Sequence, residues 1–400
     1  MLDFCKSSRY HKKNNGTRTY IMTDPALGGE AISERRRLTR SSIYHYLYSA
    51  DAPCSKQQIA RALELSLPTV YQNLNELTQA GLIGPAGTQP SSGGRPAQQL
   101  TIVPDARVAA GVSISEKRLR FVLADLRGNE LHYRSVRHDR DLHDADYAEF
   151  LASSLEAFLD ESGADRARLL GVGVSLPGVI SRDEQTVIFA PTLDLYHIPR
   201  ASLLRAIRYP TRMDNDATCG GFAELLASPP GRSFAYLSLE YGVGGTVLTG
   251  GVPYPGDNNR SGEFGHMCIE PGGLKCRCGK RGCLEAYCSA SRLAAAAGTA
   301  DVFFARAAAG DHAMQLLLRD YLYHLAIGAH NIHMALDCDV VIGGFMAKYL
   351  EPYLPQLRDQ LHDLDPFAPD GGFLHLSRYP RHAAPMGAAL YYTKRFLDSV

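Results

Sequence analysis

The feature that most constrains this chain is a compact group of three cysteines and one histidine. His266, Cys276, Cys278 and Cys283 follow the spacing H-x9-C-x-C-x4-C. One imidazole and three thiolates form a closed tetrahedral set for a structural Zn²⁺ and leave no vacant position for a catalytic water. The sequence therefore predicts a zinc loop around residues 266–283, which should unfold locally when the metal is lost. A reduced cysteine-rich loop without metal is the alternative.

Three further features narrow the kind of protein that this chain can be: its other cysteines, its N-terminus and its length. Clustered cysteines in a cytosolic chain are more often a metal site than a disulfide framework, and we expect the neighbouring Cys268 and Cys288 to be buried thiols rather than ligands. No apolar run approaches the roughly 18 residues of a membrane span, and the polar N-terminus lacks the apolar segment of a signal peptide. We therefore expect a cytoplasmic protein without a membrane partner. Its 400 residues suggest two or three domains.

Residues 31–103 are predicted to form a winged helix-turn-helix, preceded by a flexible arm at residues 1–30. Apolar positions favour a helix from 31 to about 49. Ser55 then opens a capping box for a helix to about residue 63, and Ser66 caps a third helix that ends at Gly81. A short strand at 82–83, a turn-rich loop and a returning strand at 98–103 complete the pattern. A three-helix bundle with a β-hairpin is the alternative fold.

The third of these helices has the pattern of a DNA-recognition helix. Val70, Leu74 and Leu77 predict its buried face, and the polar side chains left for the outer face can bind adenine edges or phosphates. The expected DNA-binding residues on this helix are Thr69, Tyr71, Gln72, Asn73 and Asn75.

A loop and a charge asymmetry support the same partner, double-stranded operator DNA. Arg95 lies in a Gly-Gly-Arg-Pro loop, where it can enter a narrow minor groove. Residues 1–101 hold 12 Lys/Arg against 7 Asp/Glu, a local charge of +5, although the whole chain is neutral. A basic segment favours a polyanion. A winged helix that docks a protein is the rival interpretation.

From residue 104 the pattern becomes α/β, which predicts one two-lobed unit over residues 104–400. A helix is expected at 146–161. Strands are expected at 107–113, 120–126, 169–175, 234–239 and 340–342.

Several segments of this unit resemble the ROK family, which groups repressors of sugar genes with bacterial sugar kinases. Gly-Glu-Phe-Gly-His-Met at 262–267 and the run Cys-Arg-Cys-Gly-Lys-Arg-Gly-Cys-Leu-Glu-Ala-Tyr at 276–287 are similar to its signature. Further similar elements are the Pro-Gly segment at 174–178, Asp-Asn-Asp-Ala at 214–217, the glycine pair at 343–344 and Pro-Met-Gly-Ala-Ala at 385–389. The winged helix with Gly-Gly-Arg-Pro matches the repressor branch. The resemblance implies an actin-like, two-lobed ATPase fold, as in sugar kinases, with a sugar cleft between the lobes.

The resemblance also implies which residues contact an effector, expected to be a monosaccharide or phosphosugar. Carboxylates and an amide suit vicinal hydroxyls, and a histidine can bind zinc through one ring nitrogen and a hydroxyl through the other. The implied sugar-binding residues are Asn215, Asp216, Glu263, His266 and Glu285.

The phosphate-binding loops depart from those of the family's kinases, where Asp216 would be the catalytic base. The first kinase loop reads Asp-x-Gly-Gly-Thr, but residues 113–117 read Ser-Ile-Ser-Glu-Lys. The second reads Gly-Thr-Gly-x-Gly, but residues 240–244 read Glu-Tyr-Gly-Val-Gly, and Phe345 follows the late glycines. Carboxylates and bulky rings there oppose phosphate binding. We therefore expect no kinase activity and an Asp216 that only binds ligand.

Taken together, the sequence predicts a transcriptional repressor of carbohydrate-metabolism genes. A sugar in the cleft would change the spacing of two winged helices in a homodimer or homotetramer, and so change operator affinity. One alternative is an ATP-dependent sugar kinase with an appended DNA-binding domain. Another is an activator, or a regulator controlled by a protein partner.

Overall fold

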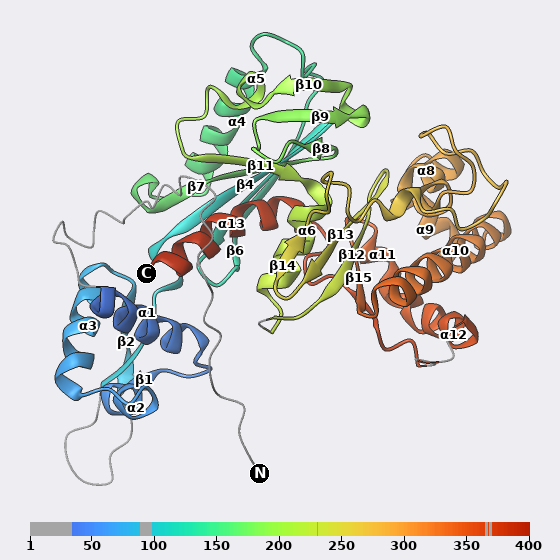
Figure 1. Ribbon diagram of the computed structural model, residues 1–400. Helices are drawn as coiled ribbons and strands as arrows, with labels where there is room; N and C mark the ends of the chain where they lie inside the picture. Colours follow the sequence, from blue (N-terminus) through green and yellow to red (C-terminus); the bar gives the residue numbers. More distant parts are fainter. Residues whose placement is uncertain (1–33, 89–97, 230, 365–366, 368–369) are drawn as a thin grey trace. The chain divides into compact units, whose positions relative to one another are not determined.

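The computed structural model describes residues 34–88, 98–229, 231–364, 367 and 370–400 (Figure 1). The chain divides into two compact units, the first covering residues 1–102 with 399–400 and the second residues 103–398. The predicted arm at residues 1–30 and the Gly-Gly-Arg-Pro loop lie outside the described residues. Among the residues described, no helix combines the length and the apolar character that crossing a membrane requires.

The first unit has the predicted order of helix, helix, turn, helix and hairpin. Its small antiparallel sheet has the order β1-β3-β2. The elements are α1 (Glu34–Ser49), β1 (Cys54–Ser55), α2 (Lys56–Ala62), α3 (Leu67–Gln79), β2 (Ile83–Thr88) and β3 (Gln98–Ile102).

Local capping sets where α2 and α3 begin, as the sequence predicts. The Ser55 hydroxyl accepts the Gln58 N–H, and the Gln58 side chain accepts the Ser55 N–H at 2.7 Å, which completes the capping box. The Ser66 hydroxyl accepts the Thr69 N–H and so caps α3. Between the helices, Glu64 takes a left-handed conformation with φ 53° that makes the turn tight.

Helix α3 is held on α1 by apolar packing and by charge. Val70, Leu74 and Leu77 are buried, as predicted, together with Ile43 and Leu47 of α1. The Glu76 carboxylate pairs with two arginines of α1, Arg36 and Arg40. This packing leaves the opposite face of α3 toward solvent.

The first lobe of the second unit is built on a five-stranded sheet with the order β11-β7-β4-β5-β6. Strands β4, β5 and β6 form an antiparallel meander, while β7 and β11 run parallel to β4. The strands are β4 (Val108–Ser115), β5 (Arg118–Asp125), β6 (Glu130–Arg137), β7 (Leu169–Leu176) and β11 (Thr211–Asn215). A smaller antiparallel sheet and two helices complete the lobe: β8 (Val179–Ile180), β9 (Thr186–Ala190), β10 (Leu195–Pro199), α4 (Tyr147–Glu161) and α5 (Arg200–Leu204).

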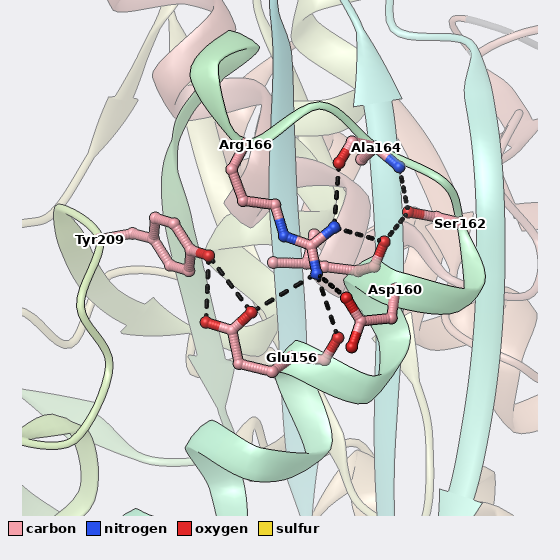
Figure 2. A network of polar contacts seen from close by, with 7 residues as sticks. Glu156, Asp160, Ser162, Ala164, Arg166 and Tyr209 are labelled. Carbon is pink, nitrogen blue, oxygen red and sulfur yellow. Dashed lines mark hydrogen bonds and ion pairs between the residues drawn. The ribbon is translucent and has the colours of Figure 1, made fainter.

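One arginine joins the end of α4 to the segment that leads into β7 (Figure 2). Arg166 donates to the backbone oxygens of Leu159 and Ala164, each at 2.9 Å, and pairs with Asp160. Tyr209 donates its hydroxyl hydrogen to the Glu156 carboxylate at 3.0 Å. Because a helix C-terminus exposes unpaired carbonyls and carries partial negative charge, a guanidinium there fixes the α4–β7 connection.

The second lobe is built on another five-stranded sheet, with the order β14-β13-β12-β15-β16. Its strands are β12 (Phe234–Leu239), β13 (Val243–Thr249), β14 (Val252–Tyr254), β15 (Asp339–Gly343) and β16 (Leu374–Leu376). Its helices are α7 (Leu284–Cys288), α8 (Ala290–Ala297), α9 (Ala300–Ala308), α10 (His312–Leu336), α11 (Ala347–Leu350) and α12 (Leu354–Leu364).

Two helices join the lobes at a tightly packed seam, α6 (Asp216–Leu226) and α13 (Ala383–Ser399) (Figure 1). A Cβ atom on Gly387 would lie 1.6 Å from the Cys219 carbonyl oxygen of α6. A Cβ on Gly173 of β7 would lie 1.9 Å from the Ala388 carbonyl oxygen. Only glycine permits backbones to approach this closely, so the seam fixes where α6, which begins at Asp216, enters the space between the lobes.

Candidate effector site, metal centre and DNA-binding face

The predicted zinc ligands converge. The ligand atoms of His266, Cys276, Cys278 and Cys283 all lie within 4.8 Å of one another. The Cys278 and Cys283 sulfurs are 3.7 Å apart, and the Cys276 sulfur lies 3.9 Å from His266 Nδ1. Tetrahedral Zn²⁺ with Zn–S bonds of about 2.3 Å needs sulfurs about 3.8 Å apart, so the donor set fits the ion.

The two neighbouring cysteines behave differently from each other. Cys288 is a buried thiol, as expected. The expectation that Cys268 is buried is wrong, since it is exposed. Its backbone forms an isolated bridge with Cys283, and its sulfur lies at the surface near the Arg281 carbonyl oxygen.

Glu285 links the cysteine loop to the turn that opens β13. Its Oε1 lies 3.6 Å from the Cys276 sulfur, and its Oε2 accepts the Val243 N–H at 3.0 Å. The turn runs past Gly242, where a Cβ would lie 2.9 Å from that same Oε2. Glu285 therefore connects the cysteine loop to the turn before β13. The spacing of these residues along the sequence does not reveal this connection.

Asn215 and Asp216 lie where β11 ends and α6 begins. The Asn215 amide oxygen caps α6 by accepting the Thr218 N–H at 3.0 Å, and its nitrogen donates to the Gly178 carbonyl oxygen at 2.9 Å. The Asp216 carboxylate accepts the Ala217 N–H. Burial and the nearby Glu240 carboxylate raise the pKa of Asp216 to about 6. A half-buried carboxyl with an elevated pKa is typical of a functional site.

The Glu240 carboxylate lies in a polar setting that draws on both lobes. Its Oε1 accepts the Phe345 N–H at 3.0 Å, and its Oε2 lies 3.8 Å from Arg120 Nη1 of β5. Burial raises the pKa of Glu240, while the Arg120 guanidinium opposes that rise. Glu240 thus accepts a backbone N–H from the turn after the late glycines and pairs with a cation from the first lobe. Glu116, by contrast, is exposed beside Lys117.

A cavity of about 620 Å³ lies between the lobes. Of the predicted sugar-binding residues, Asn215 and Glu263 line it, whereas Asp216, His266 and Glu285 are not among its lining residues. Three hydrogen bonds connect the lobes beside it. Arg182 donates to the Gly256 carbonyl oxygen at 3.0 Å and to the Asp257 carbonyl oxygen, and the Asn259 amide donates to the Ile180 carbonyl oxygen at 3.0 Å.

One wall of the cavity contains a charged group that the sequence analysis missed. Arg212 donates to Glu184 at 2.8 Å and to Asp214 at 2.9 Å, and its guanidinium lies 3.7 Å from the ring centre of Tyr391. All four residues line the cavity. Arg212 and Asp214 are two apart on an edge strand and so share one face, a signal present in the sequence. Glu184 and Tyr391 come from distant segments, so their positions along the sequence do not indicate this contact.

The outer face of α3 is mostly as predicted. Tyr71, Gln72 and Asn75 are exposed, and Thr69 is half-buried with its hydroxyl 2.8 Å from that of Ser66. The expectation that Asn73 faces outward is wrong. Asn73 is only 2% exposed, and its amide donates to the Thr69 carbonyl oxygen at 2.8 Å, because its position on the helix lies between the buried Val70 and Leu77. Arg95 lies outside the described residues.

Comparison with known proteins identifies both units of the chain. The model of the ROK family matches residues 109–394, and a helix-turn-helix domain model matches residues 39–83. A solved ROK family transcriptional regulator, described as a homologue of the E. coli MLC protein, superposes with a TM-score of 0.69 at 21% identity. That superposition covers 91% of this chain and 97% of the other, and it shows the fold.

Among curated proteins, repressors and kinases are both similar to the chain. The xylose repressor of Bacillus subtilis is 28% identical over 246 residues, which are 61% of this chain and 64% of the repressor. The match therefore spans a little less than two thirds of the repressor's length. The N-acetylmannosamine kinase of Salmonella arizonae is 33% identical over 204 residues, which are 49% of this chain and 69% of the kinase.

Proposed function

Because the chain belongs to the ROK family, we propose that it is a sugar-responsive transcriptional repressor that binds operator DNA through its N-terminal unit. The observation that carries this proposal is the exposed polar face of α3 in a helix-turn-helix that precedes the kinase-like unit in the sequence. Family kinases need no such helix. The repressor names of several relatives support the same direction of function.

The effector is proposed to bind between the lobes of the second unit. Asn215 and Glu263 offer an amide and a carboxylate to the cavity, which is within the size range of small-molecule sites. Asp216 lies directly after Asn215, and Glu285 joins the cysteine loop to the β13 turn. Groups of this kind bind sugar hydroxyls and reject ligands that lack them. A monosaccharide or phosphosugar is the proposed ligand class.

Zn²⁺ is the proposed occupant of the group formed by His266 and the three cysteines. The ion would have a structural role only, since four protein donors leave it no open position for a substrate. Two members of the proposed effector set are tied to this loop: His266 belongs to the group itself, and Glu285 contacts the Cys276 sulfur. Metal binding would therefore hold two sugar contacts in place.

Signal transfer is proposed to depend on the lobes and on a homodimer or homotetramer. A sugar bound between the lobes favours one lobe arrangement, and in a symmetric oligomer this changes the spacing of two winged helices. Half-sites lie at fixed helical spacing, so a coupling of about 1–3 kcal/mol would change operator affinity 5- to 150-fold.

The main alternative, a sugar kinase with an appended DNA-binding domain, is less well supported. The turn where kinases carry Gly-Thr-Gly-x-Gly begins here with Glu240, whose carboxylate already accepts the Phe345 N–H and pairs with Arg120. A carboxylate in that place repels phosphate groups. Phosphorylation of any hexose with ATP by the wild type, lost in Asp216→Asn, would establish the kinase instead.

The proposed DNA-binding face has a matched test within one helix. Gln72 lies in the second turn of α3 and Gln79 in the last, and both are exposed. Because the N-terminal part of a recognition helix contacts bases, Gln72→Ala should weaken binding to a selected DNA site about 5- to 100-fold. Gln79→Ala should change it much less. Fluorescence anisotropy at fixed salt measures both, and equal losses in the two variants would argue against this docking face.

A further inference from the structure

The first two turns of α3 expose two large apolar side chains, beside the smaller Pro68. Leu67, the first residue of the helix, is 45% exposed, and Tyr71 is 50% exposed. Residues four apart on a helix lie next to each other on one face. We call Leu67 and Tyr71 the apolar ridge. It forms no part of the buried side of α3, which is made by Val70, Leu74 and Leu77.

The ridge is held by a neighbouring cation. Lys56, the first residue of α2, places its ammonium 3.5 Å from the ring centre of Tyr71. A cation over a ring face restrains the ring at little cost. The ammonium also puts positive charge beside the ridge, which suits a partner with phosphates.

The chemistry of a DNA major groove offers one apolar group to such a surface, the C5 methyl of thymine. The N-terminal residues of a recognition helix are those that contact base edges. Leu67 is the first residue of α3, and Gln72 directly follows Tyr71. Amide side chains favour adenine, so the polar neighbour and the apolar ridge both point to A·T pairs.

We propose that Leu67 and Tyr71 recognise thymine methyl groups, so that each half-site carries thymine beneath the first two turns of α3. This inference rests on the proposed DNA-binding function and specifies the chemistry of the DNA that fits it. Specificity comes from burial of apolar surface, and it is therefore distinct from the hydrogen bonds offered by Gln72 and Asn75.

The test removes single methyl groups from the DNA. The full-length protein first selects a site from a random duplex library. Each thymine of that site is then replaced by deoxyuridine, which lacks only the methyl group, and the dissociation constant is measured at fixed salt. Loss of one buried methyl contact should weaken binding about fourfold, and about 15-fold when both half-sites of a symmetric site are changed.

Three variants assign the effect to the ridge. With Leu67→Ala, the thymine-to-deoxyuridine ratio at the sensitive position should fall to about 1, whereas Leu67→Met should restore most of it. Gln72→Ala should weaken binding but leave that ratio unchanged. Since Leu67 is exposed, its substitution should not impair folding, which thermal unfolding checks.

The outcomes separate this inference from the function on which it depends. A selected site that binds equally well with thymine or deoxyuridine at every position overturns the inference and leaves DNA binding intact. So does a deoxyuridine effect that persists unchanged in both Leu67→Ala and Tyr71→Ala. If the library yields no preferred sequence at physiological salt, the DNA-binding function itself fails, and the inference fails with it.

Discussion

Asp216→Asn is expected to make the ligand-free protein more stable at pH 7.5 while weakening its affinity for sugar. Burial and the neighbouring Glu240 raise the pKa of Asp216 to about 6, against an ordinary 3.8. Keeping this carboxylate charged in the folded protein therefore lowers the free energy of unfolding. For such a difference in pKa the decrease is of order 3 kcal/mol. Asparagine keeps the acceptor for the Ala217 N–H and removes the charge. We expect a gain of about 1–3 kcal/mol.

The raised pKa of Asp216 also determines how the free energy of unfolding depends on pH. The folded protein binds the Asp216 proton more tightly than the unfolded chain does, so this group's contribution to stability rises as pH falls from above 6 toward 4. Above pH 7 the penalty of the buried charge is complete. Asp216→Asn should remove this part of the pH profile.

Urea unfolding between pH 4.5 and 8, together with calorimetric titration of a bound sugar, measures both effects. Glu116→Gln is the matched control, because that carboxylate is exposed and should change neither property. A variant that is less stable than the wild type at pH 7.5 would contradict the role assigned to Asp216.

Loss of one of the proposed zinc ligands is expected to have the largest effect on the second unit. Cys278→Ser should abolish stoichiometric zinc and unfold the loop around residues 266–283, because structural Zn²⁺ contributes about 10–16 kcal/mol to folding in small zinc domains. Cys278 is exposed, so little packing is lost with its sulfur. Sugar affinity should fall as well, since Glu285 lies against Cys276 and supports the β13 turn.

Cys268→Ser provides the control for this experiment. Cys268 is also an exposed thiol, and it pairs through its backbone with Cys283, but it is not part of the ligand group. The Cys268→Ser variant should retain one zinc per chain and the melting temperature of the wild type. Elemental analysis measures the zinc content of the wild type and both variants, and hydrogen exchange measures whether the loop is folded in each. Freshly purified wild type with well under one zinc per chain and a normally folded loop would contradict the metal assignment.

Features set by neighbouring residues were the ones the sequence predicted best. The capping residues Ser55 and Ser66 act on backbone groups three positions away, so their helices begin where expected. The four residues predicted to bind zinc lie within one short segment and converge as expected. Local chemistry alone determines these positions.

Features that depend on distant segments were missed or misjudged. The error at Asn73 is of another kind: its polarity suggests the outer face of α3, but its spacing from Val70 and Leu77 places it on the buried face. Cys268 is exposed, although its backbone pairs with that of the buried Cys283. The Arg120–Glu240 pair and the contact of Arg212 with Tyr391 join residues far apart in the chain. Spacing along the sequence carries no information about such contacts.

The most direct test of the proposed function is the affinity of the purified protein for DNA from upstream of its own gene, titrated with a panel of monosaccharides and phosphosugars at fixed salt. The proposal predicts tight, sequence-selective binding that one sugar weakens about 5- to 150-fold. Binding no tighter than to random DNA at physiological salt would contradict the DNA-binding function. Selective binding that none of the sugars alters would contradict control by a sugar.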